Sequence, residues 1–196
     1  MNSVAHVKFN EPMNFKTDIP LHDQVDLNET GQDIPKYPDQ VIAYAQSLID
    51  QSLAESNQVE KAKLIALSSV YYRRVRKLNL ALELIEEAIS LVPSDSPLLL
   101  SWNVRRGHVL HWMGKFDDAN ECFDSVIASK SSYVHFAYQH KGKCLLDSGN
   151  PKLALACFNL ALEIRHELGD ESLIESTDYA IKCCNQLLLK TNLEEG

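Results

Sequence analysis

Apolar residues recur along most of this chain at the spacing of one face of an α-helix. The pattern starts after Asp39, where Val41, Ala45 and Leu48 open a stripe that predicts a first helix ending near Glu55. No turn between residues 39 and 190 is flanked by the alternating apolar and polar residues of a β-hairpin. The sequence therefore predicts that this region is almost wholly helical.

A unit of about 34 residues repeats after the first helix. Each copy carries an alanine that is followed four positions later by Ile or Phe and seven positions later by Ala or Val. The copies lie 38 and 35 positions apart, so short insertions separate them. The alanines are Ala81, Ala119 and Ala154, the large residues are Ile85, Phe123 and Phe158, and the small ones are Ala88, Val126 and Ala161.

Glycines repeat in the same register and predict helical hairpins. Gly107 and Gly142 are expected to let two antiparallel helices approach closely, while the bulky phenylalanines fill the space between successive hairpins. A second glycine follows seven positions later in each copy. It is expected to end the first helix of the hairpin, because glycine tolerates the left-handed conformation found there. This second pair is Gly114 and Gly149.

This order of residues resembles the tetratricopeptide repeat, whose signature places a large apolar residue early in the first helix, then Gly, a large residue, Ala, an aromatic residue and Ala. The resemblance identifies three repeats, at residues 62–95, 100–133 and 135–168. The first repeat has Ser69 in place of the glycine, and Trp102 of the second stands one place early. The resemblance implies an all-α fold, a right-handed superhelix of antiparallel helical hairpins, in a family defined by architecture rather than by activity.

The remaining segments are expected to flank or complete one repeat domain over residues 38–190. Residues 1–37 contain three prolines among polar residues and predict an irregular arm. A last amphipathic stretch, residues 171–190, is expected to form a capping helix, and residues 191–196 a tail. The arm carries apolar residues that could lie in the groove of the repeats and mimic a ligand, namely Val7, Phe9, Met13 and Phe15.

Two features depart from the family pattern. Arg106 and Lys141 stand where the family usually has Leu, which predicts looser helix packing or side chains that extend outward. The best-known peptide-binding members of the family grip a C-terminal carboxylate with Lys, Asn and Arg side chains. That clamp is absent, because the matching positions here are Ala66, Val70, Arg105, Phe136 and His140.

The resemblance also implies a position for a binding groove. In this family the first helix of each hairpin lines the concave face, and the matching positions here are mixed basic and aromatic, whereas the second helices carry carboxylates. A locally positive cleft attracts acidic segments. The alternative is that the arginines pair with neighbouring hairpins or with the acidic arm. The predicted groove residues, expected to be exposed, are Lys63, Val70, Arg73, Arg74, Ser101, Arg105, His108, His111, Trp112, Phe136, Gln139, His140 and Lys143.

Composition and charge exclude several classes of partner. The formal net charge of -8 argues against general nucleic-acid binding, because affinity for phosphates needs a basic surface. No apolar run approaches the roughly 20 residues that span a bilayer, so no membrane partner is expected. The first residues show no secretory signal pattern. We therefore expect a cytoplasmic location.

No metal, cofactor or catalytic site is expected. His108 and His111 share a helix face with His140 on the equivalent helix of the next hairpin, but neither Cys nor a carboxylate completes a zinc site. Cys122 and Cys157 hold the same repeat position and are expected in the core, too far apart for a disulfide. A phosphate-binding glycine loop, a nucleophile elbow and an HExxH motif are all missing from the sequence.

The sequence thus predicts a non-enzymatic scaffold or adaptor that holds a protein or peptide, acidic in character, in the groove. Two alternatives stay open. The layout of three repeats with a helix at either end also resembles the chaperones of type III secretion translocators. A self-associating homodimeric module, whose arm docks into a neighbour, is the other alternative. Co-expression separates the adaptor from the chaperone, because a chaperone is required for the solubility of its client.

Overall fold

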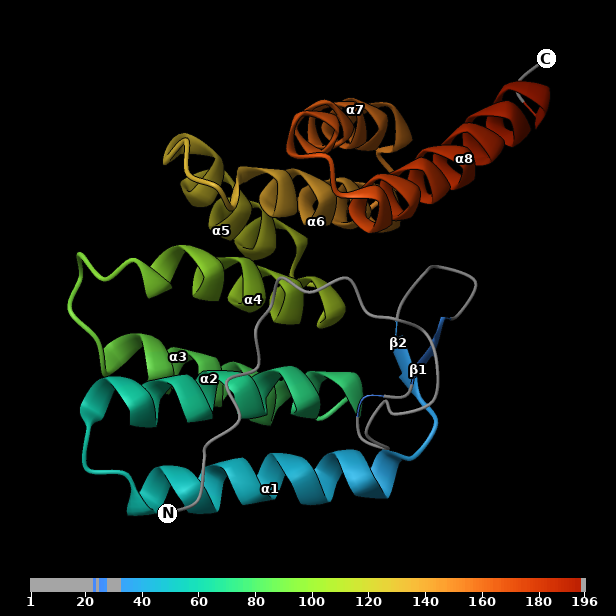
Figure 1. Cartoon of the computed structure of the whole chain (residues 1–196). Helices are drawn as coiled ribbons and strands as arrows, with labels where there is room; N and C mark the ends of the chain where they lie inside the picture. The colour runs from blue at the N-terminus through green and yellow to red at the C-terminus, as the bar shows by residue number, and fades with distance from the viewer. Residues whose placement is uncertain (1–22, 24, 28–32, 195–196) are drawn as a thin grey trace.

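The computed structural model describes residues 23, 25–27 and 33–194, and eight helices hold most of them (Figure 1). The prediction of an almost wholly helical region between residues 39 and 190 is confirmed. The helices are α1 (Pro38–Ala54), α2 (Gln58–Arg74), α3 (Leu78–Ser90), α4 (Leu98–Trp112), α5 (Phe116–Ala128), α6 (Val134–Asp147), α7 (Pro151–Leu168) and α8 (Glu171–Glu194).

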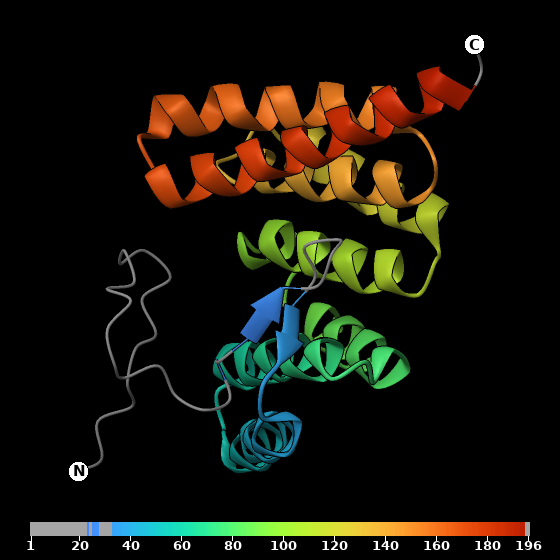
Figure 2. The ribbon, with the colours of Figure 1, turned by 90° about the vertical axis from the view of Figure 1, so that its right-hand side faces the viewer.

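Consecutive helices pack side by side as antiparallel hairpins, in the order α2 with α3, α4 with α5, and α6 with α7. Helix α1 packs on α2 at one end of the stack, and α8 packs on α7 at the other. Figures 1 and 2 show this succession from α1 to α8, with the last turns of α8 extending beyond α7. The predicted all-α superhelix with a helix at each end is the observed fold.

The predicted repeat register is confirmed by close contacts inside the hairpins. A β-carbon added at Gly107 would lie 2.6 Å from a ring carbon of Phe123, and one added at Gly142 would lie 2.5 Å from a ring carbon of Phe158. The aromatic ring therefore needs glycine opposite it. In the first hairpin, Ser69 and Ile85 hold the positions of this glycine and this phenylalanine. The alanines Ala81, Ala119 and Ala154 are fully buried.

The turns between the paired helices share one backbone geometry. Gly114 and Gly149 follow α4 and α6 with φ values of 75° and 81°, in the left-handed region. The equivalent position after α2 is Arg76, with φ 61°. A side chain in this region is strained, because its β-carbon crowds the following carbonyl oxygen. Arg76 thus keeps the geometry of a glycine turn without glycine, which the sequence did not predict.

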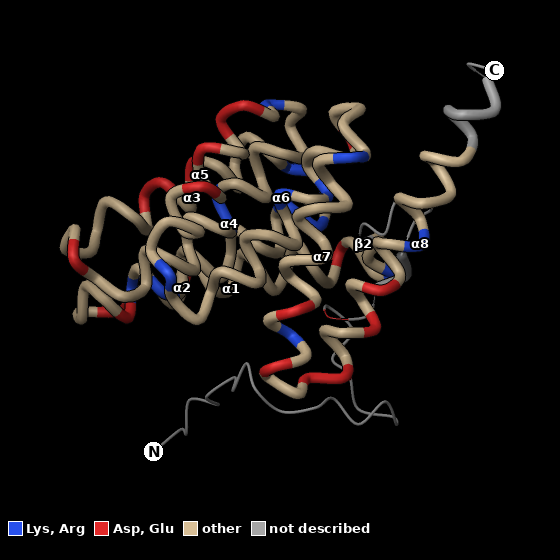
Figure 3. Tube along the Cα trace, turned by 90° about the horizontal axis from the view of Figure 1, so that it is seen from above, with Lys and Arg blue, Asp and Glu red and all other residues tan. Residues whose placement is uncertain are grey.

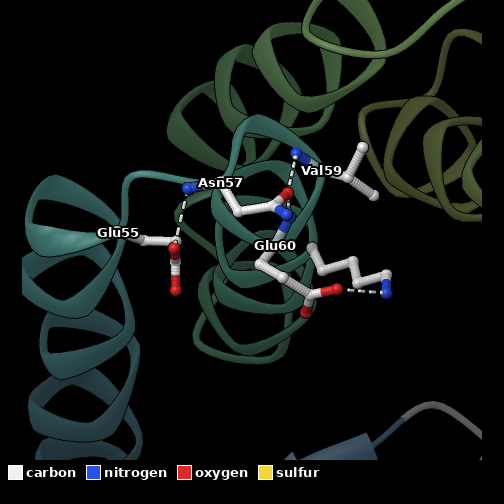
Figure 4. Close-up of polar contacts among 5 residues, drawn as sticks. Glu55, Asn57, Val59 and Glu60 are labelled. Atoms are coloured by element: carbon white, nitrogen blue, oxygen red, sulfur yellow. Dashed lines mark hydrogen bonds and ion pairs between the residues drawn. The ribbon is translucent and has the colours of Figure 1, made fainter.

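The start of α2 is fixed by a side-chain cap, shown in Figure 4. The Asn57 Oδ1 atom accepts hydrogen bonds from the backbone N–H groups of Val59, at 3.0 Å, and Glu60, at 3.2 Å. The Glu55 carboxylate accepts one from the Asn57 N–H at 2.7 Å. These bonds satisfy backbone donors that a helix start leaves free, so the link from α1 to α2 is short and well defined.

The side chains of Arg106 and Lys141 extend outward, which is one of the two outcomes predicted from the sequence. Arg106 forms an ion pair with Glu86 of α3 at 3.0 Å, and Lys141 pairs with Asp124 of α5. In both cases the cation comes from the first helix of one hairpin and the carboxylate from the second helix of the hairpin before it. The pairs therefore repeat with the fold.

The arm was expected to be irregular, but it contains two short antiparallel strands, β1 (Val25–Leu27) and β2 (Asp33–Pro35). Strands of three residues show too little alternation to be recognised in sequence. Figure 2 shows the strand pair beside the stack of helices. The four apolar arm residues that could mimic a ligand lie outside the described residues.

Candidate partner-binding surface

The first helices α2, α4 and α6 follow one another along one side of the stack, which we call the first-helix face. Of the predicted groove residues, Lys63 is exposed and nine are half-buried. The nine are Val70, Arg74, Ser101, Arg105, His108, Trp112, Phe136, His140 and Lys143. The prediction of exposure is wrong for the other three residues. The exposed fractions of Arg73, His111 and Gln139 are only 6%, 4% and 3%.

Arg73 is buried because it packs between two hairpins. Its guanidinium carbon lies 4.3 Å from the ring centroid of Trp112 on α4, and its Nη1 atom lies 3.4 Å from Nε2 of His108. The guanidinium of Arg76 lies 4.1 Å from the same Trp112 centroid. Cations over an indole face are attracted by the ring quadrupole. Arg73 therefore joins α2 to α4 instead of facing solvent.

Three histidines cluster on the first helices α4 and α6. The ring of His108 lies 4.2 Å from that of His140 and 6.2 Å from that of His111, measured between centroids. Burial, followed by the charge of Arg73, lowers the pKa of His108 well below its ordinary value, and burial with Lys143 does the same for the pKa of His140. Both rings are therefore neutral at neutral pH. Over the described part of the chain, no three His, Cys, Asp or Glu side chains are arranged to hold a metal ion.

His111 and Gln139 are buried by polar partners on neighbouring helices. His111 Nε2 lies 2.8 Å from a carboxylate oxygen of Asp147, at the end of α6. The Gln139 side-chain oxygen accepts a hydrogen bond from Arg165 at 3.3 Å. Each partner lies on a different helix from the residue that it binds. Buried polar groups need such partners, so these contacts lower the cost of burying both side chains.

Arg165 of α7 is a buried cation that was not predicted from the sequence. Its exposed fraction is 2%, and its Nη1 atom donates to Thr177 Oγ1 at 2.6 Å and to the Leu173 carbonyl at 2.9 Å. Its Nε atom donates to His135 Nδ1 at 3.3 Å. Burial lowers the pKa of Arg165 to about 10, so the side chain stays charged at neutral pH. The sequence contains a signal for this burial, because Arg165 continues the helical spacing of the buried residues Ala154, Phe158 and Ala161.

Two further arginines bind acceptors at the edge of the same face. Arg105 donates to the Ala66 carbonyl at 3.4 Å, and burial lowers its pKa. Arg74 Nη1 donates to the Asp23 carboxylate of the arm at 3.0 Å, and the Tyr71 hydroxyl donates to the same oxygen at 3.0 Å. For Arg74, the alternative that an arginine pairs with the acidic arm therefore holds.

Charge is separated between the three first helices and two of the second helices, α3 and α5, whereas α7 carries both Lys152 and Arg165 and both Glu163 and Glu167. The first helices carry Lys61, Lys63, Arg73, Arg74, Arg105, Arg106, Lys141 and Lys143, against only Glu60 and Asp147. Helices α3 and α5 carry no Lys or Arg, and their charged residues are Glu83, Glu86, Glu87, Asp117, Asp118, Glu121 and Asp124. Figure 3 shows the acidic positions along α3 and α5 and basic positions on α4 and α6. Packing alone does not require this separation.

A separate hollow of about 350 Å³ lies between the start of α2 and the end of α3. Its lining residues carry no charge and include no nucleophile with an adjacent base. They are Gln58, Val59, Ser90, Leu91, Val92 and Pro93. Arg73 and Arg74 lie at the other end of α2, so this hollow is separate from the residues that carry chemistry.

The stacked hairpins define the chain as an α-solenoid protein. Residues 137–167 match the family model of the tetratricopeptide repeat. This match identifies a tetratricopeptide repeat in the third hairpin, and the stacked hairpins have the fold of proteins built from such repeats. None of the curated proteins matches its sequence significantly, and no described helix is long and apolar enough to cross a membrane.

Solved structures with the same fold are distant in sequence. BtubC from P. vanneervenii has 16% identity and a TM-score of 0.57, over 76% of this chain and 63% of that one. The chain thus spans less than two thirds of BtubC. A structure of nearly identical TPR-like repeats of a kinesin light chain from Podosopora anserina has 12% identity and a TM-score of 0.58, over 82% of this chain and 85% of that one. At these identities the likeness shows the fold alone.

Proposed function

We propose that the chain is a non-enzymatic binding scaffold that holds an extended acidic segment of a partner protein along its first-helix face. The observation that carries this proposal is the separation of charge, with cations on α2, α4 and α6 and only carboxylates as charged groups on α3 and α5. A field of this kind raises the rate at which an acidic segment reaches the positive side and orients it on arrival. The repeat family supports the proposal, since its members generally act as scaffolds rather than as catalysts.

Several side chains of the face are of the types that contribute most to protein interfaces. Trp112, Phe136 and Arg105 are half-buried, which leaves part of each surface for a partner while packing holds the rest in place. Tryptophan, tyrosine and arginine are enriched among the residues that dominate binding energy. Side chains already fixed by neighbours lose little entropy when a partner binds.

Site-specific crosslinking tests the proposal. A photoreactive amino acid replaces Lys143 on α6 in one variant and Glu121 on α5 in a control variant, and each is irradiated in an extract of the native cell. The proposal expects a partner that crosslinks from position 143 and not from position 121. Crosslinking that is equal at the two positions, or stronger at position 121, overturns it.

Charge reversal then tests the acidic character of the partner, once crosslinking has identified it. Arg105→Glu is expected to weaken binding by at least about tenfold, since like charges are brought together. Glu121→Lys is the matched reversal on the other face and should leave affinity unchanged. Added salt should reduce the association rate of the wild-type chain and have less effect on Arg105→Glu.

Co-expression and crosslinking with the same partner distinguish the scaffold from the two alternatives, a chaperone and a self-associating module. A chaperone is expected to be required for solubility when its client is co-expressed, whereas a scaffold leaves the solubility of its partner unchanged. A self-associating module is expected to crosslink to a second copy of this chain. Either result, in place of a distinct soluble partner, contradicts the scaffold proposal.

A further inference from the structure

One carboxylate of the arm is held by two donors on the first-helix face. Asp23 Oδ1 accepts hydrogen bonds from the Tyr71 hydroxyl and from Arg74 Nη1, each at 3.0 Å. The donors lie 48 and 51 residues further along the chain, so only the tertiary fold brings them to Asp23. Both come from the last turns of α2, next to Arg73 and Arg76. The contact therefore lies beside the arginines that pack on Trp112.

The two donors are held in place by packing. The Tyr71 side chain is buried, and its ring meets that of Tyr44 on α1 edge to face, with centroids 4.9 Å apart. The guanidinium of Arg74 lies 5.1 Å from the Tyr71 centroid. Burial raises the pKa of the Tyr71 hydroxyl, so it remains a donor at physiological pH. We call Tyr71 and Arg74 the carboxylate seat, since together they present two fixed donors to one oxygen.

The occupant of the seat is partly open to water. Asp23 precedes the strand pair β1–β2, whose strands have only three residues each, and so short a pair is marginal by itself. In this ion pair, the Arg74 side chain is 21% exposed and the Asp23 side chain is 35% exposed. Ion pairs that are open to water contribute little to stability. An incoming carboxylate can therefore reach the seat and replace Asp23.

We propose that Asp23 is an internal ligand of the carboxylate seat, which an acidic side chain of the partner displaces when it binds. The arm then lowers the affinity of the unbound chain for its partner. Only a partner with an acidic side chain that competes with Asp23 binds well. This inference rests on the proposed function, because it places one acidic side chain of the partner at Tyr71 and Arg74. A tethered competitor acts at a high effective concentration, so even a weak internal contact reduces binding.

Hydrogen exchange tests the internal contact without any partner. In the full chain, Asp23→Asn and Arg74→Gln should each speed amide exchange in residues 25–27 and 33–34 several-fold, because the strand pair loses its attachment to α2. The double variant Asp23→Arg with Arg74→Glu restores the pair with reversed charges and should slow exchange again. Asp39→Asn, in the first turn of α1, is the control and should leave exchange in the strands unchanged.

Competition tests the seat itself. The probe is a fluorescent peptide with the sequence of residues 19–37, measured by anisotropy against the full chain. It should bind the Asp23→Ala chain at least about tenfold more tightly than wild type, because the tethered competitor has lost its carboxylate. A probe that itself carries the Asp23→Ala change should lose this gain.

The two proposals fail in different ways. Unchanged exchange in the single variants, or equal affinity of the probe for the wild-type and Asp23→Ala chains, overturns the internal ligand, whatever crosslinks form at position 143. Crosslinking that does not favour position 143 overturns the scaffold, even if the probe binds as expected. In that case the contact between Asp23 and Arg74 only attaches the arm to α2.

Discussion

Phe158 lies so close to Gly142 that a β-carbon on the glycine would stand 2.5 Å from Cε1 of the ring. Gly142→Ala should therefore destabilise the chain by about 1–3 kcal/mol, because the buried ring has to shift. Urea denaturation measures the change. The first hairpin suggests the rescue, since Ser69 and Ile85 hold the equivalent positions. Gly142→Ser combined with Phe158→Ile should cost less than the sum of the single changes, and simple additivity would contradict the proposed contact.

The turn after α2 allows a matched test of backbone strain. Arg76→Gly and Arg76→Ala both remove the guanidinium from Trp112, but only alanine keeps a β-carbon in the left-handed conformation. The glycine variant should therefore be more stable than the alanine variant by about 1 kcal/mol. Thermal and urea unfolding compare the two. Equal stability would mean that the turn relaxes out of the left-handed region.

Acid should weaken the fold through His135. Burial, followed by the charge of Arg165, lowers the pKa of His135 from 6.5 to about 4, while Asp170 acts in the opposite direction. Between these values the unfolded chain binds a proton that the folded chain does not bind, so the stability conferred by neutral His135 is complete above pH 6.5 and declines as pH falls toward 4. His135→Gln should reduce this slope in unfolding measurements across the range. An unaltered slope would assign the acid sensitivity to other groups.

The buried Arg165 should be required for the attachment of α8. Arg165→Met removes the charged donor from Thr177, Leu173, His135 and Gln139, and the loss of these charged hydrogen bonds should cost about 1.5–3 kcal/mol. Amide exchange in α8 should rise more than exchange in α4. Thr177→Val removes one acceptor and should cost about 1 kcal/mol. A loss that is spread evenly over all helices would contradict a local role.

The register of the repeats could be predicted from sequence because it depends on short-range pattern. The spacing of Ala119, Phe123 and Val126 lies within two turns of one helix, and the glycines that end the first helices lie a few residues before the next one. Helical periodicity and turn chemistry act over such distances. The hairpins and their buried alanines followed from these signals.

The candidate surface could be predicted only in outline. The choice of first helices was enough to predict cations on α2, α4 and α6 and carboxylates on α3 and α5. It was not enough to decide exposure, because Arg73 is covered by Trp112 and Gln139 by Arg165, and both covering residues come from another helix. Position along a helix fixes the direction of a side chain, but burial depends on what lies opposite.

The sequence by itself determined the helices, the repeat register, the turns at glycine and the separation of charge, since each is set by residues close together in the chain. The tertiary structure alone decided which polar side chains are buried, that Arg165 lies in the core, and that Asp23 meets Arg74 across 51 positions. Those contacts join different hairpins or the arm to a hairpin. Their partners depend on how the units stack, which no local pattern specifies.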